Sequence, residues 1–191
     1  MSMSLSGIWY QLRKAKISMG RSKLRIPCKD AEYTVKRQRV EALKKKAQDG
    51  DLTSNDVTIV DPGLMPITQR REAVLIYFDE TDLHWCPDTG KGYQVVGAQE
   101  KIDSPGQDEV WYLMGGVAYP TSEGLYQIYD RKRTIEVESY LCSIVSMFSE
   151  KFIFLIWDNA KTHTTDMLSP FFEEYRNRIC PVFLPTYSPL G

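Results

Sequence analysis

The sequence predicts an α/β fold, a mixed sheet with flanking helices, preceded by a mostly helical basic N-terminal arm. Two runs of six apolar residues, AVLIYF at 73–78 and FIFLIW at 152–157, are rich in branched and aromatic types. Such unbroken runs are typical of strands buried on both faces of a sheet. Segments with helical periodicity, 134–149 and 166–178, lie on either side of the second run.

Charge divides the chain into a basic arm and an acidic body. Of the 24 Lys and Arg residues 13 lie in residues 1–50, whereas only 4 of the 25 Asp and Glu residues do. A basic arm fits a polyanion such as DNA, and an acidic body with carboxylates in clefts fits divalent metal binding. A solvated amphipathic helix would explain the charge of the arm equally well.

Composition argues against a membrane protein and against a disulfide scaffold. No run approaches the roughly 20 apolar residues needed to span a bilayer, and MSMSLSG lacks the features of a signal peptide, so we expect a cytoplasmic protein. The cysteines Cys28, Cys86, Cys142 and Cys180 are far apart and form no CxxC pair, which disfavours both a zinc site and a disulfide framework.

The first elements are basic. Residues 6–16 predict a short helix with Ser4 or Ser6 as its N-cap, and Gly20 then marks a turn into a basic strand. Helix, turn and basic strand would suit the tail of a helix-turn-helix domain that binds DNA. The candidate DNA-binding residues are Arg13, Lys14, Lys16, Arg21, Lys23 and Arg25.

A second helix and a linker follow. Residues 30–48 have a thin apolar stripe, with Asp30 as the expected N-cap and Gly50 as the stop. Residues 51–72 contain three of the chain's Pro and Gly breakers and predict a linker that holds the domain boundary, with 57–60 as a short strand.

The remaining elements complete a sheet. The predicted elements are a hairpin or flap at 82–97, strands at 110–120 and 124–130, a helix at 134–149 capped by Thr134, a helix from Asp166 or Ser169 to about Arg178, and a strand at 180–185. Three neighbouring strands followed by a strand that alternates with helices is the order of a ribonuclease H-like fold. We therefore expect a basic arm at 1–50, a linker at 51–72 and a ribonuclease H-like domain at 73–191.

Two carboxylates stand at the ends of the buried runs. Asp79 follows the first run and Asp158 the second, and the predicted strand order places them side by side. Such a pair would repel unless a cation lay between them, and oxygen ligands select Mg²⁺ or Mn²⁺. Two ions about 4 Å apart would activate water and stabilise the leaving oxygen of a phosphodiester, but this chemistry needs one more acid. Alternatively, Asp158 and Asn159 only make a turn.

Other motifs fit poorly. DTGKGY has Gly92 where a phosphate-binding loop requires Ser or Thr, and Trp85 where its first Gly should be. With only His84 and His163, a histidine-rich zinc site is disfavoured, and no GxSxG supplies a serine nucleophile.

The phrases YFDETDLHW, FLIWDNAKTH and VFLPTYSPLG resemble motifs of the DDE transposases of the mariner-like superfamily, in their bacterial insertion-sequence branch. The start, SGIWYQLRKAKISMGRSKLR, is similar to the end of that family's second helix-turn-helix. The resemblance implies that Asp79 and Asp158 are two catalytic, metal-binding acids and that Glu80, Asn159 and His163 support them. It also implies DNA (element ends and target) as the partner and leaves open whether two copies pair on it as a homodimer.

The chain departs from this pattern after LPTYSP. The resemblance places the third acid a few residues later, on a final helix, but the sequence stops at Gly191, and the first DNA-binding subdomain is missing as well. Glu173 and Glu174 are expected on a solvated helix face instead. The expectation is thus a transposase sequence cut at both ends.

The function expected of the family is DNA strand cleavage and strand transfer by metal-assisted phosphoryl transfer. For this 191-residue piece we expect weak Mg²⁺ or Mn²⁺ binding without cleavage. The alternative is a non-enzymatic DNA-binding remnant in which only the basic arm has a role. A different ribonuclease H-like nuclease is disfavoured by LPTYSP.

Overall fold

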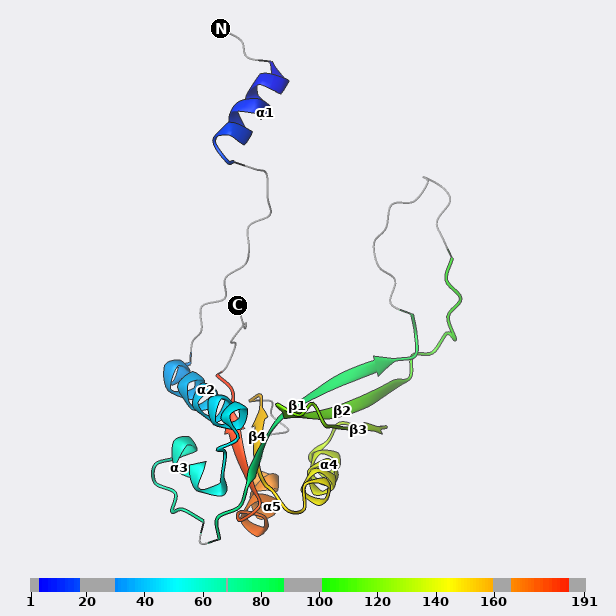
Figure 1. Ribbon diagram of the computed structural model, residues 1–191. Helices are drawn as coiled ribbons and strands as arrows, with labels where there is room; N and C mark the ends of the chain where they lie inside the picture. The colour runs from blue at the N-terminus through cyan, green and yellow to red at the C-terminus, as the bar shows by residue number, and fades with distance from the viewer. Residues whose placement is uncertain (1–3, 18–29, 68, 88–100, 160–165, 186–191) are drawn as a thin grey trace.

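The computed structural model describes residues 4–17, 30–67, 69–87, 101–159 and 166–185. Five strands form one mixed sheet in the order β3-β2-β1-β4-β5 (Figure 1). Their bounds are Ala73–His84 for β1, Val110–Tyr119 for β2, Gly124–Tyr129 for β3, Phe152–Trp157 for β4 and Ile179–Phe183 for β5. β2 runs antiparallel to β1 and β3, whereas β4 runs parallel to β1 and β5. The predicted mixed, ribonuclease H-like sheet is confirmed.

Helices lie on both sides of the sheet, with α2 and α3 on one side and α4 and α5 on the other (Figure 1). The bounds are Leu5–Lys14 for α1, Tyr33–Asp49 for α2, Val57–Val60 for α3, Thr134–Met147 for α4 and Ser169–Glu174 for α5; short 3₁₀ turns span Ser54–Asp56 and Asp166–Leu168. Among the described helices, none has both the length and the apolar character needed to cross a membrane.

The two cores meet on β4. Its six residues are all buried, and alternate side chains enter opposite cores. Ile153, Leu155 and Trp157 pack with α4 and α5 on what we call the α4 face. Phe152, Phe154 and Ile156 pack with Leu43 of α2 and with Val57 on the α2 face. This double burial explains why the run at 152–157 is apolar without a break.

β1 is longer than predicted. It continues through Asp79 to His84, whereas the sequence placed its end at Phe78. The pairing with parallel β4 does stop near the predicted end, at Tyr77 and Ile156, but the pairing with β2 goes on to His84. The apolar run at 73–78 therefore marks the part of β1 that has a neighbouring strand on both sides. The polar residues after it pair with β2 alone.

The start of α2 and the segment at 57–60 correct two predictions. α2 begins at Tyr33, and the Asp30 carboxylate accepts from the Glu32 N–H at 2.9 Å, so Asp30 forms the preceding turn and does not cap the helix. Residues 57–60 are the helix α3 and not a strand. The Asp56 carboxylate accepts from the Thr53 N–H at 2.8 Å, and this bond closes the turn that leads into α3.

One predicted helix end is confirmed and two differ by a few residues. α1 is capped by Ser4, one of its two predicted N-caps, whose hydroxyl accepts from the Gly7 N–H. Thr134 is the first residue of α4, and the Glu136 carboxylate satisfies the Arg133 N–H at 3.0 Å and also binds the Arg133 guanidinium. α5 starts at Ser169 and ends at Glu174 instead of near Arg178.

Adjacent glycines in β2 offer a test of the packing. A Cβ added at Gly116 would lie 2.8 Å from the hydroxyl oxygen of buried Tyr140, which donates to the Leu125 carbonyl, and 3.1 Å from Ile144 Cδ1. A Cβ at Gly115 would meet only the exposed ring of Tyr126, at 3.1 Å. We therefore expect Gly116→Ala to lower the free energy of unfolding by about 1 to 3 kcal/mol and Gly115→Ala to cost less.

Urea denaturation of both variants measures this difference, and Gly115→Ala is the control because it makes the same chemical change on the same strand. Equal losses in the two variants would contradict the packing of Tyr140 against Gly116.

Candidate active site

Asp79 and Asp158 lie at one end of the parallel pair β1 and β4. The last paired residues are Tyr77 and Ile156, so each aspartate stands two residues beyond its partner in the register and on the α2 face. Both aspartates line the same cavity, which has a volume of about 630 Å³. The structure thus brings the two carboxylates to one place, as the predicted strand order implies.

The backbone around Asp158 is held on both sides. Trp157 is fully buried, and its ring stacks on Phe183 with centroids 5.7 Å apart. The Leu184 N–H donates to the Trp157 carbonyl at 2.9 Å, and the Asn159 side-chain amide donates to the Leu184 carbonyl at 2.5 Å. The chain leaving β5 therefore fixes the residues before and after Asp158. Asn159 thus ties the residue after Asp158 to the chain that leaves β5.

Glu80 points away from this pair. Successive strand residues face opposite sides, so the Glu80 carboxylate lies on the α4 face, where its side chain is only 3% exposed. The ammonium of Lys132, in the loop before α4, lies 3.1 Å from the Glu80 carboxylate and 3.6 Å from that of Asp82. Glu80 therefore anchors β1 to the loop before α4. The basic run RKR at 131–133, which follows β3, is the sequence feature that could have indicated Lys132 as a partner for a carboxylate of β1.

The donor set at the cavity consists of oxygen atoms. Two carboxylates, with the neighbouring amide of Asn159, suit a hard divalent cation better than a thiophilic one. Within the residues that the structure describes, no group of three or more His, Cys, Asp and Glu side chains gathers as a metal cluster. The residues present fit a weakly held Mg²⁺ or Mn²⁺ through Asp79 and Asp158.

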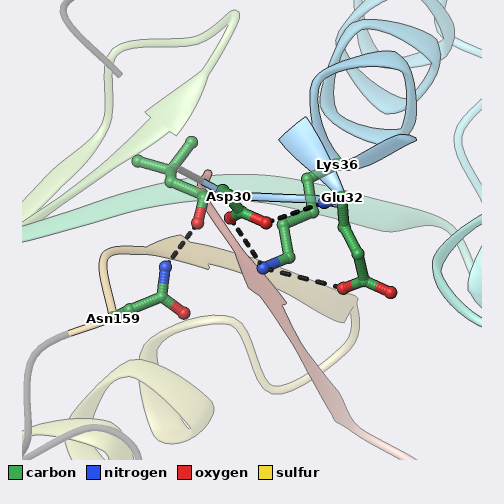
Figure 2. Close-up of polar contacts among 5 residues, drawn as sticks. Asp30, Glu32, Lys36 and Asn159 are labelled. Carbon is green, nitrogen blue, oxygen red and sulfur yellow. Dashed lines mark hydrogen bonds and ion pairs between the residues drawn. The ribbon is translucent and has the colours of Figure 1, made fainter. Parts of the chain in front are cut away.

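A second cavity lies beyond Asn159. Its volume is about 300 Å³, and its lining includes Asn159, Glu32 and, from α2, Lys36 and Arg39. Figure 2 shows the Lys36 ammonium between Asp30 and Glu32, at 2.9 and 3.7 Å from their carboxylates. The sequence alone gives no sign of this contribution from α2, because only the fold brings residues 36–39 beside residue 159.

The predicted DNA-binding residues are only partly described. Arg13 and Lys14 form the basic last turn of α1, with the Arg13 guanidinium 4.8 Å from the centre of the Trp9 ring, and Lys16 follows the helix with a φ of 56°. Four predicted site residues lie outside the described residues: Arg21, Lys23, Arg25 and His163.

The ion pair between Lys132 and Glu80 gives a stability prediction. We expect Lys132→Met to lower the free energy of unfolding by about 1 to 3 kcal/mol, because it removes the ammonium that lies 3.1 Å from the buried Glu80 carboxylate. Burial opposes the charge of Lys132, but the hydrogen bond and charge of Glu80 outweigh it and raise the pKa of Lys132 above 10.5. The contribution is therefore complete below pH 10.5 and is lost as the pH rises through the raised pKa.

Urea midpoints measured at about pH 8 and again above the Lys132 pKa check this prediction. Lys151→Met is the control, since the Lys151 partner Glu72 is 70% exposed and the pair should contribute little. If Lys132→Met loses no more stability than Lys151→Met, or if its loss grows with pH, the ion pair between Lys132 and Glu80 does not stabilise the protein.

Comparison with known proteins agrees with this geometry. Residues 74–190 match the model of the DDE superfamily endonuclease family. The uncharacterized 39 kDa protein of insertion element IS630 from Shigella sonnei is 29% identical over 119 residues, which are 62% of this chain and 34% of that protein.

Two solved structures share the fold. One is the Mos1 transposase paired-end complex with the left transposon end, with a TM-score of 0.59 and 14% identity over 98% of this chain and 52% of that one. The other is the Mos1 mariner paired-end complex with Mn, with a TM-score of 0.55 and 14% identity over 97% of this chain and 52% of that one. This chain spans about half the length of these structures and about a third of the insertion-element protein. Since the family model covers more than half of the chain, the chain belongs to the DDE superfamily of endonucleases.

Proposed function

We propose that the protein is a transposase that cleaves and transfers DNA strands by metal-assisted phosphoryl transfer, with Asp79 and Asp158 as metal-binding catalytic acids. The observation that carries the proposal is the meeting of these two carboxylates in one cavity at the end of β1 and β4. Two relatives in the fold support it, since their structures are a Mos1 complex with a transposon end and a Mos1 complex with Mn.

Asp79 and Asp158 would hold Mg²⁺ or Mn²⁺ between two strands. A bound divalent ion would activate the attacking oxygen and neutralise charge on the phosphate and the leaving oxygen. The Asp79 carboxylate is oriented by the Glu80 N–H, which donates to it at 2.8 Å. The backbone just before Asp158 is held by the Leu184 N–H, which donates to the Trp157 carbonyl at 2.9 Å. This rigidity keeps the two carboxylates in place and lowers the cost of organising the site.

Basic residues of the chain would bind the DNA backbone. Arg13 and Lys14 end α1, and Lys36 and Arg39 line the cavity next to Asn159. Phosphate contacts from such residues position DNA without reading its sequence. We propose that Asp79 and Asp158 alone bind the cation weakly and that strand cleavage needs a third carboxylate. The rival function, a non-enzymatic DNA-binding remnant, uses only the basic residues.

Metal titration tests the acids. We expect Asp79→Asn and Asp158→Asn each to weaken Mn²⁺ binding by about tenfold or more, because each removes one of two charged ligands from a hard cation. The paramagnetic resonance signal of free Mn²⁺ measures the affinity.

Asp82→Asn is the matched control, because Asp82 lies on the same strand but pairs with Lys132 on the other face. Unchanged Mn²⁺ affinity in Asp158→Asn, or an equal loss in the Asp82 variant, would remove the metal site from the proposal.

Salt dependence tests the arm. We expect the triple variant of Arg13, Lys14 and Lys16 to Ala to reduce the slope of log affinity for duplex DNA against log salt by up to about three, because each lost phosphate contact removes about 0.9. Fluorescence anisotropy at several salt concentrations gives the slope.

The matched control replaces Lys101, Lys151 and Arg176 by Ala, which makes the same charge change on the body of the protein. If both triple variants change the slope alike, the arm has no particular role in DNA binding. Salt-dependent DNA binding without any effect of Asp79 or Asp158 on Mn²⁺ would favour the non-enzymatic rival.

A further inference from the structure

An exposed tyrosine stands in register with the acids. Gly115 of β2 pairs with Asp79 on one side and with Tyr126 of β3 on the other. Paired residues on neighbouring strands point to the same face, so these three residues form a row across the α2 face. Asp158 extends the row on the far side of β1. The row therefore runs from an aromatic ring, over a glycine, to the two carboxylates.

Two glycines let the Tyr126 ring lie along the sheet. A Cβ at Gly115 would come within 3.1 and 3.2 Å of one edge of the ring, and a Cβ at Gly124 within 2.7 to 2.9 Å of the other edge. The ring thus rests over both glycines, and a side chain at either position would displace it. Tyr126 is still 60% exposed, so the second face of its ring is open.

The open ring belongs to the same cavity as the acids. Asp79, Asp158, Gly115 and Tyr126 all line the space of about 630 Å³. Tyr126 is two strands from Asp79, which at the usual spacing places their Cα atoms roughly 10 Å apart. This separation suits a phosphate held through a divalent cation at the carboxylates and a base of the same or the next nucleotide held at the ring.

Charge on the opposite side of the acids fits the same strand of DNA. Beyond Asp158, the cavity at Asn159 has Arg39 in its wall beside Lys36, and Figure 2 shows Lys36 paired with Asp30 and Glu32. A nucleic acid strand crossing the α2 face would pass Arg39 first, then the two carboxylates, then the aromatic ring. The order matches a chain of phosphates with a base exposed at one end.

We propose that Tyr126 is a stacking platform for an unpaired nucleobase of the DNA strand whose phosphate a divalent cation at Asp79 and Asp158 would hold; this inference rests on the proposed function. Stacking on an exposed ring accepts any base, because every base has a π face. The glycines hold the ring in its stacking position before DNA arrives, so little side-chain entropy is lost on binding. Tyr126 is a positioning residue that holds the base and leaves the chemistry to the acids.

A purely structural role for Tyr126 makes a different prediction. An aromatic ring over a strand glycine can stabilise a sheet without any ligand. In that case replacing Tyr126 would lower the stability of the protein and would affect every DNA probe alike. A stacking platform instead affects only DNA that has a base to place on the ring.

The test uses 2-aminopurine, whose fluorescence falls when it stacks. The probe is a duplex with a single-stranded 3′ extension that carries 2-aminopurine at alternate positions, in Ca²⁺ buffer, and a second probe has abasic sites at those positions. We expect wild type and Tyr126→Phe to quench the fluorescence on binding. Tyr126→Leu should abolish the quenching and weaken binding of the base-containing probe roughly 5- to 100-fold.

Ile128→Ala is the matched control, because Ile128 lies on the same face of β3 and is 59% exposed. It should leave quenching unchanged, and the abasic probe should bind wild type and Tyr126→Leu equally. If Tyr126→Leu does not fold, the binding of the base-containing and the abasic probe to the wild type still tests the stacking role. Bound DNA without quenching, or equal wild-type affinity for both probes, overturns the stacking role and leaves the metal site standing. Unchanged Mn²⁺ affinity in Asp158→Asn, measured as above, would overturn the proposed function separately.

Discussion

The site depends on the parallel pairing of β1 with β4. β4 is buried on both faces, so both hydrophobic cores hold it in place, and the pairing of Tyr77 with Ile156 sets where the next polar residues stand. A slip of one residue would put Asp79 and Asp158 on opposite faces of the sheet. The fit of the two cores around β4 is therefore also what fixes the distance and direction of the two carboxylates.

Strand alternation separates two adjacent carboxylates into different roles. Asp79 faces the open cavity, whereas Glu80 turns to the α4 face, where Lys132 neutralises it. The buried pair of Glu80 with Lys132 anchors β1, while the Asp79 carboxylate stays at the cavity that it shares with Asp158. The cavity at Arg39, the two carboxylates and the Tyr126 ring then follow one another across a single face of the sheet.

Much of this arrangement was predictable because burial leaves a strong sequence signal. The runs at 73–78 and 152–157 gave the central strands, and the aspartates after them gave the pair that the structure brings to one cavity. The continuation of β1 to His84 was missed because pairing on one side needs no apolar run. Lys132, Lys36 and Tyr126 were missed because the residues beside which they lie, Glu80, Asn159 and Asp79, are distant in sequence and only the fold brings them together.

The central claim, that Asp79 and Asp158 share one divalent cation, is tested most directly by replacing that cation with Fe²⁺ and mapping where the chain is cut. Hydroxyl radicals formed at bound iron cleave the backbone close to the metal. The account predicts cuts near residue 79 in β1 and near residue 158 after β4, both suppressed by excess Mn²⁺ and by Asp158→Asn. Cuts confined to another part of the chain, such as the His84 and Asp108 pair at the end of β1, would contradict it.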